Sequence, residues 1–174
     1  TYAQTPDATY TAKVKSTDIY KDLALGSAIE KKDVEIYVDG VENDSAAPIA
    51  IRKGSDTKVG VSGNGVLTEV FYDDVADTMV ITQIVTYIGE VAKTVKATDK
   101  RDAYVVITAK TGDNNAYTMP KDSKGIKASP LEFETDETFA DDTYVLYTYS
   151  FKAEAVKSLA AAEKVKGYVT KTIN

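Results

Sequence analysis

The chain has 174 residues, 43% of them hydrophobic and 28% charged, and its formal net charge is −6. A chain of this length and composition is expected to fold around its own core, and its acidic charge repels the phosphate backbone of nucleic acids. It contains no Cys and no His, which excludes disulfides, thiolate or imidazole catalysis, and the usual zinc and iron–sulfur sites.

The beginning of the chain predicts a strand followed by the one short helix of the first half. Residues 10–14 alternate between apolar and polar side chains, which is typical of a half-buried strand. Ser16 or Thr17 can cap a helix over residues 17–25, and Gly26 can end it. A helix of about two turns needs packing against other elements to persist.

A hairpin signal follows at Asp39-Gly40. The alternating residues 34–38 predict a strand before this dipeptide, and Asp-Gly favours a tight two-residue turn. Further along, residues 49–51 and 57–61 predict two short strands on either side of Lys53-Gly54-Ser55.

The clearest hairpin has its arms at residues 66–72 and 78–88, joined by the turn at residues 73–77. The second arm is apolar on both of its faces, which predicts a central strand. Gly89 is a natural bend point after it, and residues 90–95 predict a further strand.

Strands are also predicted in the second half, separated by a long polar stretch. Residues 103–109 are apolar on both faces, and the polar stretch Lys110–Ser129 predicts the longest loop. Residues 144–151 give the strongest strand pattern, with one face made of Val145, Tyr147, Tyr149 and Phe151. Residues 153–166 fit a helix by propensity and a strand by alternation, and we favour the strand; residues 167–173 return to strand.

The sequence therefore predicts an all-β, mainly antiparallel fold with one short helix near residues 17–25. We expect two sub-domains. Residues 1–88 would form a sheet with the helix packed on it, and residues 89–174 a small antiparallel barrel or sandwich. No apolar run approaches the roughly 20 residues of a membrane helix, so no membrane span is expected.

One turn offers a candidate calcium site. Asp73, Asp74 and Asp77 lie within five residues, and calcium prefers carboxylate oxygens. The EF-hand pattern fails, because Val75 and Thr78 occupy positions where that loop needs an oxygen ligand and a glycine. A looser calcium site and an ordinary solvated hairpin turn both remain open, with the solvated turn favoured.

The densest run of acids raises the possibility of a carboxylate-based glycoside hydrolase. Paired carboxylates run that chemistry, and the run consists of Glu132, Glu134, Asp136, Glu137, Asp141 and Asp142. Sugar sites normally add aromatic platforms, and the chain has no Trp. We therefore expect an acidic solvated loop here rather than an active site, and a chain that is not an enzyme.

Tyrosines on the strand at residues 144–151 offer a possible binding surface. Tyr144, Tyr147 and Tyr149, together with the loop Lys110–Ser129, are the basis of an alternative function as a carbohydrate- or peptidoglycan-binding module. Tyrosines at alternating strand positions more often pack in the core and against neighbouring strands, so we favour the packing role.

Five strand-and-turn strings follow one another in an ordered series along the chain. They are Glu35-Ile36-Tyr37-Val38-Asp39-Gly40-Val41-Glu42, Gly63-Asn64-Gly65-Val66-Leu67-Thr68-Glu69-Val70, Thr86-Tyr87-Ile88-Gly89-Glu90-Val91, Asp142-Thr143-Tyr144-Val145-Leu146-Tyr147-Thr148-Tyr149-Ser150 and Ala162-Glu163-Lys164-Val165-Lys166-Gly167-Tyr168-Val169-Thr170-Lys171. Together they resemble the β-rich region beside the S-layer homology repeats in large surface proteins of Gram-positive anaerobes. The similarity runs from about Thr17 to Lys171.

The resemblance implies export and an extracellular location at the cell surface or cell wall. It implies a non-catalytic structural or interaction module whose partners are other domains of the parent protein, cell-wall glycan or neighbouring S-layer subunits. The chain starts without Met and stops inside a predicted strand, so we expect it to be a piece of that larger protein. It lacks the short helical motifs of the S-layer homology repeat itself, and none of its strings is a catalytic signature.

Overall fold

The computed structural model describes residues 4–43, 49–110 and 130–163. In chain order its elements are β1 (Ala8–Tyr10), α1 (Ser16–Asp22), the 3₁₀ turn η1 (Lys31–Asp33), β2 (Val34–Val38), β3 (Val41–Glu42), β4 (Val66–Asp73), β5 (Thr78–Val95), β6 (Tyr104–Ala109), β7 (Leu131–Glu134), β8 (Tyr144–Ser150) and β9 (Ala155–Ala161). The fold is all-β and mostly antiparallel, and α1 is the one α-helix in these ranges. The predicted fold class is therefore confirmed.

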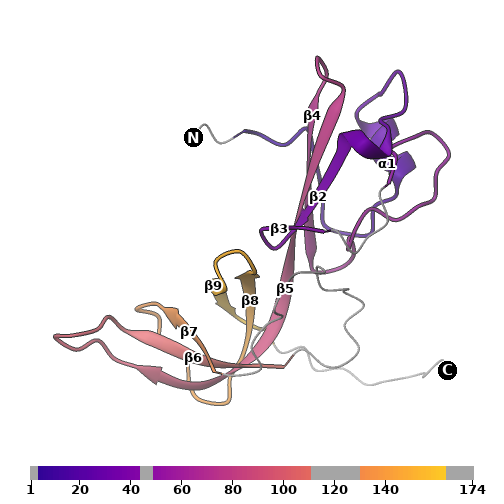
Figure 1. Ribbon diagram of the computed structural model, residues 1–174. Helices are drawn as coiled ribbons and strands as arrows, with labels where there is room; N and C mark the ends of the chain where they lie inside the picture. The colour runs from indigo at the N-terminus through magenta and orange to yellow at the C-terminus, as the bar shows by residue number, and fades with distance from the viewer. Residues whose placement is uncertain (1–3, 44–48, 111–129, 164–174) are drawn as a thin grey trace, which may run out of the picture.

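The first sheet has the strand order β1-β4-β5-β2-β3, and Figure 1 shows α1 near its upper end. β4 and β5 form the predicted antiparallel hairpin, with Asp73 opposite Thr78 beside the turn. β2 lies on the other side of β5 and runs parallel to it, with residues 34–38 opposite residues 79–83. A parallel pair needs a long connection, which here passes through β3 and β4.

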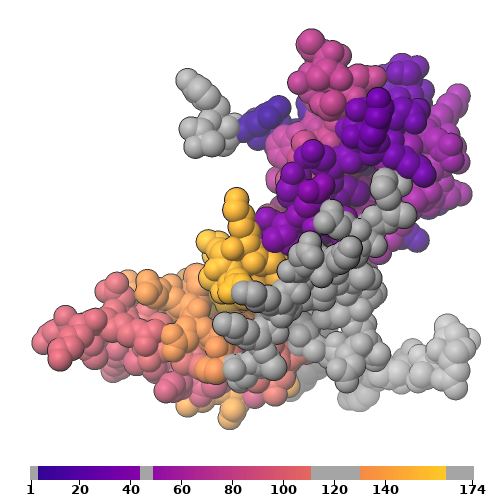
Figure 2. All heavy atoms as spheres, viewed as in Figure 1, coloured from indigo at the N-terminus to yellow at the C-terminus, as the bar shows by residue number. Residues whose placement is uncertain are grey.

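The second sheet is antiparallel, with the order β7-β6-β5-β8-β9. Its outer strands β7 and β9 contact each other, so the sheet curls toward an open barrel. Figures 1 and 2 show the two sheets as two lobes that meet along β5. The buried apolar side chains of both lobes belong to one continuous cluster, which includes Ile81 and Val70 in the first lobe and Ile107 and Val145 in the second.

One strand of 18 residues, β5, serves both sheets. It pairs with β4 and β2 as far as Val85, and with β8 from Thr86 onward. We call the pair Val85–Thr86 the crossing. The further strand predicted over residues 90–95, after a bend at Gly89, is not a separate element, because β5 continues through Gly89 to Val95. The division into sub-domains 1–88 and 89–174 stays a prediction.

Close packing explains the glycine at position 89. A Cβ atom there would lie 2.5 Å from Cγ2 of Ile107 and 3.2 Å from Cε1 of Tyr147. The irregularity in β5 lies later, at Ala92, which is the extra residue where the pairing with β6 shifts register. Such a bulge bends the strand and increases its twist, so Ala92 takes the role that the sequence suggested for Gly89.

One face of β5 is exposed along its length. Its central place in both sheets agrees with the predicted central strand. Odd-numbered residues such as Ile81 and Tyr87 are buried, whereas Val80, Ile84 and Ile88 are 36%, 40% and 49% exposed. Apolar side chains, several of them β-branched, thus occupy both faces of the strand, and only one of these faces is covered.

The segment around residue 14 is not the regular strand that was predicted for residues 10–14. β1 ends at Tyr10, and Val14 is buried while its main chain contacts a loop. Val14 O accepts a hydrogen bond from Val59 N, and the Ser62 hydroxyl both accepts from Val14 N and donates to Val14 O. The strands predicted at residues 49–51 and 57–61 are likewise reduced to single bridges, Ile29 with Ile51 and Lys15 with Lys58.

The predicted helix exists, but its first turn is held differently. The N-cap is Lys15, whose N–H donates to the Asp18 carboxylate over 2.8 Å. Ser16 and Thr17, the predicted caps, turn instead to the neighbouring loop: Ser16 Oγ donates to Ala50 O, and Thr17 Oγ1 accepts from the N–H of residue 54. The helix ends at residue 22, ahead of Gly26.

The strands predicted for the second half are confirmed where the structure describes them. β6 and β8 match the predicted strands at residues 103–109 and 144–151, and β9 resolves the stretch 153–166 in favour of strand over Ala155–Ala161. The loop at residues 111–129 and the strand predicted at residues 167–173 lie outside the described residues. No described helix is long and apolar enough to cross a membrane.

Candidate functional site

The crossing in β5 is the feature that joins the two lobes. Where a strand leaves one sheet and enters another, some of its amides lose a neighbouring strand as hydrogen-bond partner, and an unpaired buried amide is costly. Here each of two consecutive amides donates a hydrogen bond to a residue in a turn. Val85 N donates to Asp39 Oδ1 over 2.9 Å, and Thr86 N donates to Gly65 O over 2.8 Å. The two turns therefore hydrogen-bond to β5 at the crossing.

The Asp39 carboxylate is buried, with only 4% of the residue exposed. Its second oxygen, Oδ2, accepts a 2.6 Å hydrogen bond from the Tyr87 hydroxyl, two residues beyond Val85 on the same strand. A buried carboxylate is tolerated when it accepts hydrogen bonds of this kind. The Asp39 side chain thus accepts hydrogen bonds from β5 at the crossing, from Val85, and just beyond it, from Tyr87.

The main chain of Asp39 adds two further connections. Asp39 N donates to Gln83 O on β5, and Asp39 O accepts from Phe151 N just beyond β8. Asp39 and Gly40 form the predicted tight turn between β2 and β3, with positive φ angles of 49° and 87°. This conformation suits Asp and Gly. One residue therefore links β2, β5 and the end of β8.

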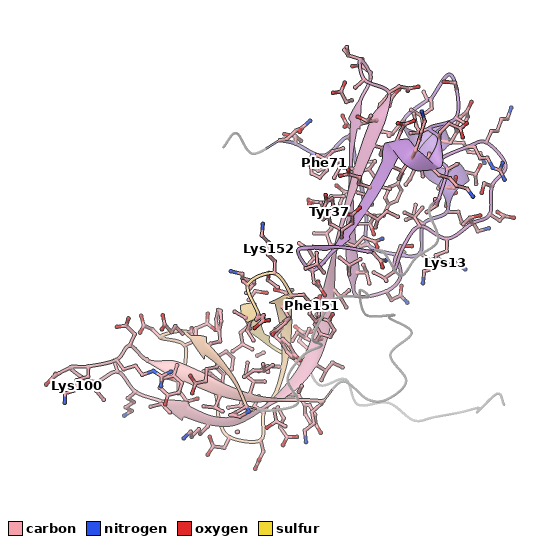
Figure 3. All side chains as sticks on the ribbon, viewed as in Figure 1. Lys13, Tyr37, Phe71, Lys100, Phe151 and Lys152 are labelled. Carbon is pink, nitrogen blue, oxygen red and sulfur yellow. The ribbon has the colours of Figure 1, made fainter. Side chains whose placement is uncertain are left out.

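The end of β8 also packs closely on this turn. A Cβ atom added to Gly40 would lie 3.1 Å from Oγ of Ser150 and 3.4 Å from Cβ of Lys152. Figure 3 shows Phe151 beside β5 between the two lobes and Lys152 next to β3. Glycine at position 40 therefore allows the positive φ angle and also the close approach of the second lobe.

Two stacked tyrosines lie opposite each other just beyond the crossing, Tyr87 on β5 and Tyr147 on β8. The rings of Tyr87 and Tyr147 are 5.5 Å apart between centroids, and both residues are almost fully buried. The Tyr87 hydroxyl bonds to Asp39, whereas the Tyr147 hydroxyl has no hydrogen-bond partner among the described residues. Burial, followed by the nearby Tyr149, raises the pKa of Tyr147 to about 12. The stack therefore pairs one satisfied and one unsatisfied phenol.

Gln83, two residues before the crossing, uses its buried side chain to bond to main-chain groups in the first lobe, as Asp39 does at the crossing. It is 1% exposed, accepts from Val61 N, and donates to Val59 O and Thr68 Oγ1. Gly60 lies so close that an added Cβ atom would clash with the Gln83 side chain. A buried amide side chain thus replaces the missing strand partners of an irregular loop.

The second lobe has an apolar hollow on the exposed face of its sheet. Ile88 on β5 lies opposite Leu146 on β8, and Leu146 lies opposite Ala160 on β9. The hollow has a volume of about 570 Å³, and it is lined by Ile88, Tyr144, Leu146, Ala161, Ala162 and Glu163. Glu90, which lies opposite the lining residue Tyr144, forms an ion pair with Lys110, 3.4 Å apart.

The candidate calcium residues lie at the tip of the β4–β5 hairpin. Asp73 Oδ1 accepts from the N–H groups of Val75 and Ala76, which is the local bonding of an ordinary Asp turn. Asp77 has a positive φ of 57° and accepts from the Tyr72 hydroxyl. Asp74 is exposed. Within residues 4–43, 49–110 and 130–163, no cluster of three possible metal ligands is found. The favoured solvated turn and the alternative of a looser calcium site both stay predictions.

The predicted acidic loop is partly a strand. Glu132 and Glu134 lie on one face of β7, where Glu132 forms an ion pair with Arg101, whose guanidinium also lies over the Tyr104 ring at 3.7 Å. A cavity of about 350 Å³ adjoins them. The two carboxylates are neighbours on one strand rather than residues facing each other across a cleft.

The structure separates the three tyrosines of the proposed binding surface. Tyr147 and Tyr149 are 1% and 4% exposed and pack in the core, as favoured from the sequence, while Tyr144 is 42% exposed beside the apolar hollow. They therefore do not form one aromatic platform.

Sequence reasoning identified Asp39 only as a turn residue. Its buried carboxylate was missed because the partners, Val85 and Tyr87, are 46 and 48 residues away along the chain. The Asp-Gly turn was the available signal, since it marks a short polar side chain between two apolar strands. No family model, curated protein or solved structure matches the chain.

Proposed function

We propose that this chain is a non-catalytic structural module of a secreted, S-layer-associated cell-surface protein, in which it holds two β-lobes at a fixed geometry. The observation that carries the structural role is that both sheets share β5. At the crossing, Val85 N donates a hydrogen bond to the Asp39 carboxylate and Thr86 N donates one to Gly65 O. A single strand that runs through two sheets resists bending at their boundary, because bending would break hydrogen bonds in both sheets.

Support for the surface location is the resemblance of the strand-and-turn strings to the β-rich region of S-layer homology proteins. The full-length gene product tests it directly. An export signal and S-layer homology repeats in that product would support the surface role, and their absence would contradict it. Steady turnover of cell-wall glycans by the purified chain would contradict the non-catalytic role.

The fixed geometry is tested by measuring a distance distribution between spin labels in the two lobes. The chain has no Cys, so two introduced cysteines are labelled without background. Val75 at the tip of the β4–β5 hairpin is 93% exposed, and the exposed Lys100 lies at the tip of the other lobe (Figure 3). We expect one narrow distance peak for the Val75→Cys, Lys100→Cys double variant.

The matched comparison adds Asp39→Asn to the labelled pair. Asn keeps the shape and tolerates the positive φ, but its amide NH₂ replaces one of the two acceptor oxygens. We expect the peak to broaden in this variant while its circular dichroism spectrum keeps the β signature. A broad or double peak in the parent pair would contradict the fixed geometry.

A further inference from the structure

The turn Gly63–Val66 carries a feature that the structural role does not use, the dipeptide Asn64-Gly65. Asn-Gly occurs once in the chain. Asn64 and Gly65 are both exposed, and Gly65 has a φ of 77°. Apart from its chain neighbours, no heavy atom in the described part of the chain lies within 4 Å of the place where a Cβ would lie. Val66 N donates to Gly63 O across the turn.

The reactive atoms of this turn are free. Among the described residues, neither the Asn64 side chain nor the Gly65 N–H takes part in a hydrogen bond. Because glycine lacks a side chain and no described side chain or main-chain atom crowds the Cβ position of Gly65, the peptide plane between the two residues has room to rotate. That rotation brings Gly65 N toward Cγ of Asn64.

We propose that Asn64 is a site of spontaneous deamidation that loosens the crossing. Gly65 N, after losing its proton, attacks Asn64 Cγ; a C–N bond forms, and the side-chain nitrogen takes up a proton and leaves as ammonia. Water then adds to one of the two carbonyl carbons of the resulting succinimide and cleaves its C–N bond. The products are aspartate or isoaspartate, and each adds one negative charge to the chain.

The location gives the modification a structural consequence. Gly65 O is the acceptor for Thr86 N, so the modified residue lies next to one of the two bonds at the crossing. Isoaspartate routes the main chain through an additional carbon, which displaces Gly65 relative to β5. The opposite bond, from Val85 N to Asp39, is unaffected, so the lobes stay folded while their connection weakens on one side.

The chain provides its own control at the same crossing. Asp39-Gly40 is its one Asp-Gly dipeptide, and Asp-Gly forms the same succinimide with loss of water. Asp39 is 4% exposed and both carboxylate oxygens accept hydrogen bonds, so Cγ is not free to approach Gly40 N. Folding should therefore protect residue 39 and leave residue 64 reactive.

The test incubates the folded chain in H₂¹⁸O at neutral to mildly alkaline pH and maps peptides by mass spectrometry, with a sample in concentrated urea alongside. We expect ¹⁸O uptake at Asn64 in both samples at similar rates. At Asp39, we expect uptake in the folded chain to be at least roughly a hundredfold slower than in urea, because its hydrogen bonds must open first. Uptake at Asn64 that is as strongly suppressed by folding as uptake at Asp39 would overturn the proposal.

A second readout separates the chemistry from its consequence. In the isoaspartate fraction, amide exchange at Thr86 should speed up at least tenfold relative to fresh protein, while the Asn64→Ser variant should show neither ¹⁸O uptake at position 64 nor faster exchange. Deamidation with unchanged exchange at Thr86 would overturn the claim that the crossing loosens. Neither measurement depends on the surface role of the protein.

Discussion

The two stacked tyrosines allow a matched test of the bonding at the crossing. Tyr87 and Tyr147 are both almost fully buried and in ring contact, so Phe at either position removes one hydroxyl from a similar environment. Tyr87→Phe breaks the 2.6 Å bond to Asp39 and leaves a buried carboxylate oxygen with one donor fewer. Hydrogen bonds to charged groups contribute roughly 1.5–3 kcal/mol, so we expect the free energy of unfolding to fall by about 2 kcal/mol.

Tyr147→Phe should behave in the opposite way. Its hydroxyl makes no hydrogen bond among the described residues, so removing it relieves the cost of a buried unsatisfied group. We expect a change between about 0 and 1 kcal/mol in the stabilising direction. Urea unfolding followed by far-ultraviolet circular dichroism measures both variants. A Tyr147→Phe variant destabilised as much as Tyr87→Phe would refute the assignment of the bond to Asp39.

Three further predictions concern packing, polar contacts and pH. Gly89→Ala should lower the free energy of unfolding by about 1–3 kcal/mol, because the added Cβ atom meets Ile107. In Gly26→Ala the added Cβ atom meets no described atom within 4 Å, so this variant should be neutral or stabilised by up to about 1 kcal/mol. Equal melting temperatures for the two variants would contradict the close packing at Gly89. Gln83→Leu should cost roughly 3 kcal/mol, since the main-chain groups of Val59 and Val61 lose their partner, and a loss below about 1 kcal/mol in urea unfolding would argue that water replaces the side chain. The pKa of Tyr147 is raised to about 12 in the folded chain, against 10.0 in the unfolded chain, so the unfolded chain loses this proton at a lower pH. The free energy of unfolding should therefore decline from pH 10 toward pH 12, and it should decline less steeply in Tyr147→Phe. Parallel pH profiles of the two proteins would contradict the raised pKa.

The sequence predicted the elements whose signals are local. Asp-Gly at residues 39–40, the β4–β5 hairpin and the alternating apolar face of β8 each depend on neighbours within a few residues, and each is present in the structure. The class of fold followed from these elements, because the strand and turn patterns together describe a sheet protein.

The sequence did not predict the features that depend on distant contacts. Gly89 has the local signature of a bend, yet it is a glycine because Ile107 and Tyr147 pack against it from other strands. Ser16 has the signature of a helix cap, yet its hydroxyl bonds to Ala50 O in a loop that comes 34 residues later. The Asp39 carboxylate is the clearest case, since a turn aspartate is usually solvated and this one is 4% exposed and bonded to Val85 and Tyr87.

The exposed face of β5 shows the limit of pattern reasoning in the other direction. Val80, Ile84 and Ile88 give the strand an apolar pattern on both faces, and β-branched residues favour strands whether or not they are covered. Composition alone therefore does not distinguish a buried face from an exposed one in this strand.

Native-state hydrogen exchange tests the central claim, that the shared strand β5 holds the two lobes at a fixed geometry, because lobes joined in this way should unfold as one cooperative unit. In increasing urea, the slowest amides of the first lobe, such as Ile81, and of the second lobe, such as Ile107, should converge on the same free energy and the same urea dependence. Exchange of the second lobe at a clearly lower free energy, with a smaller urea dependence, would show that it opens independently and would contradict the account.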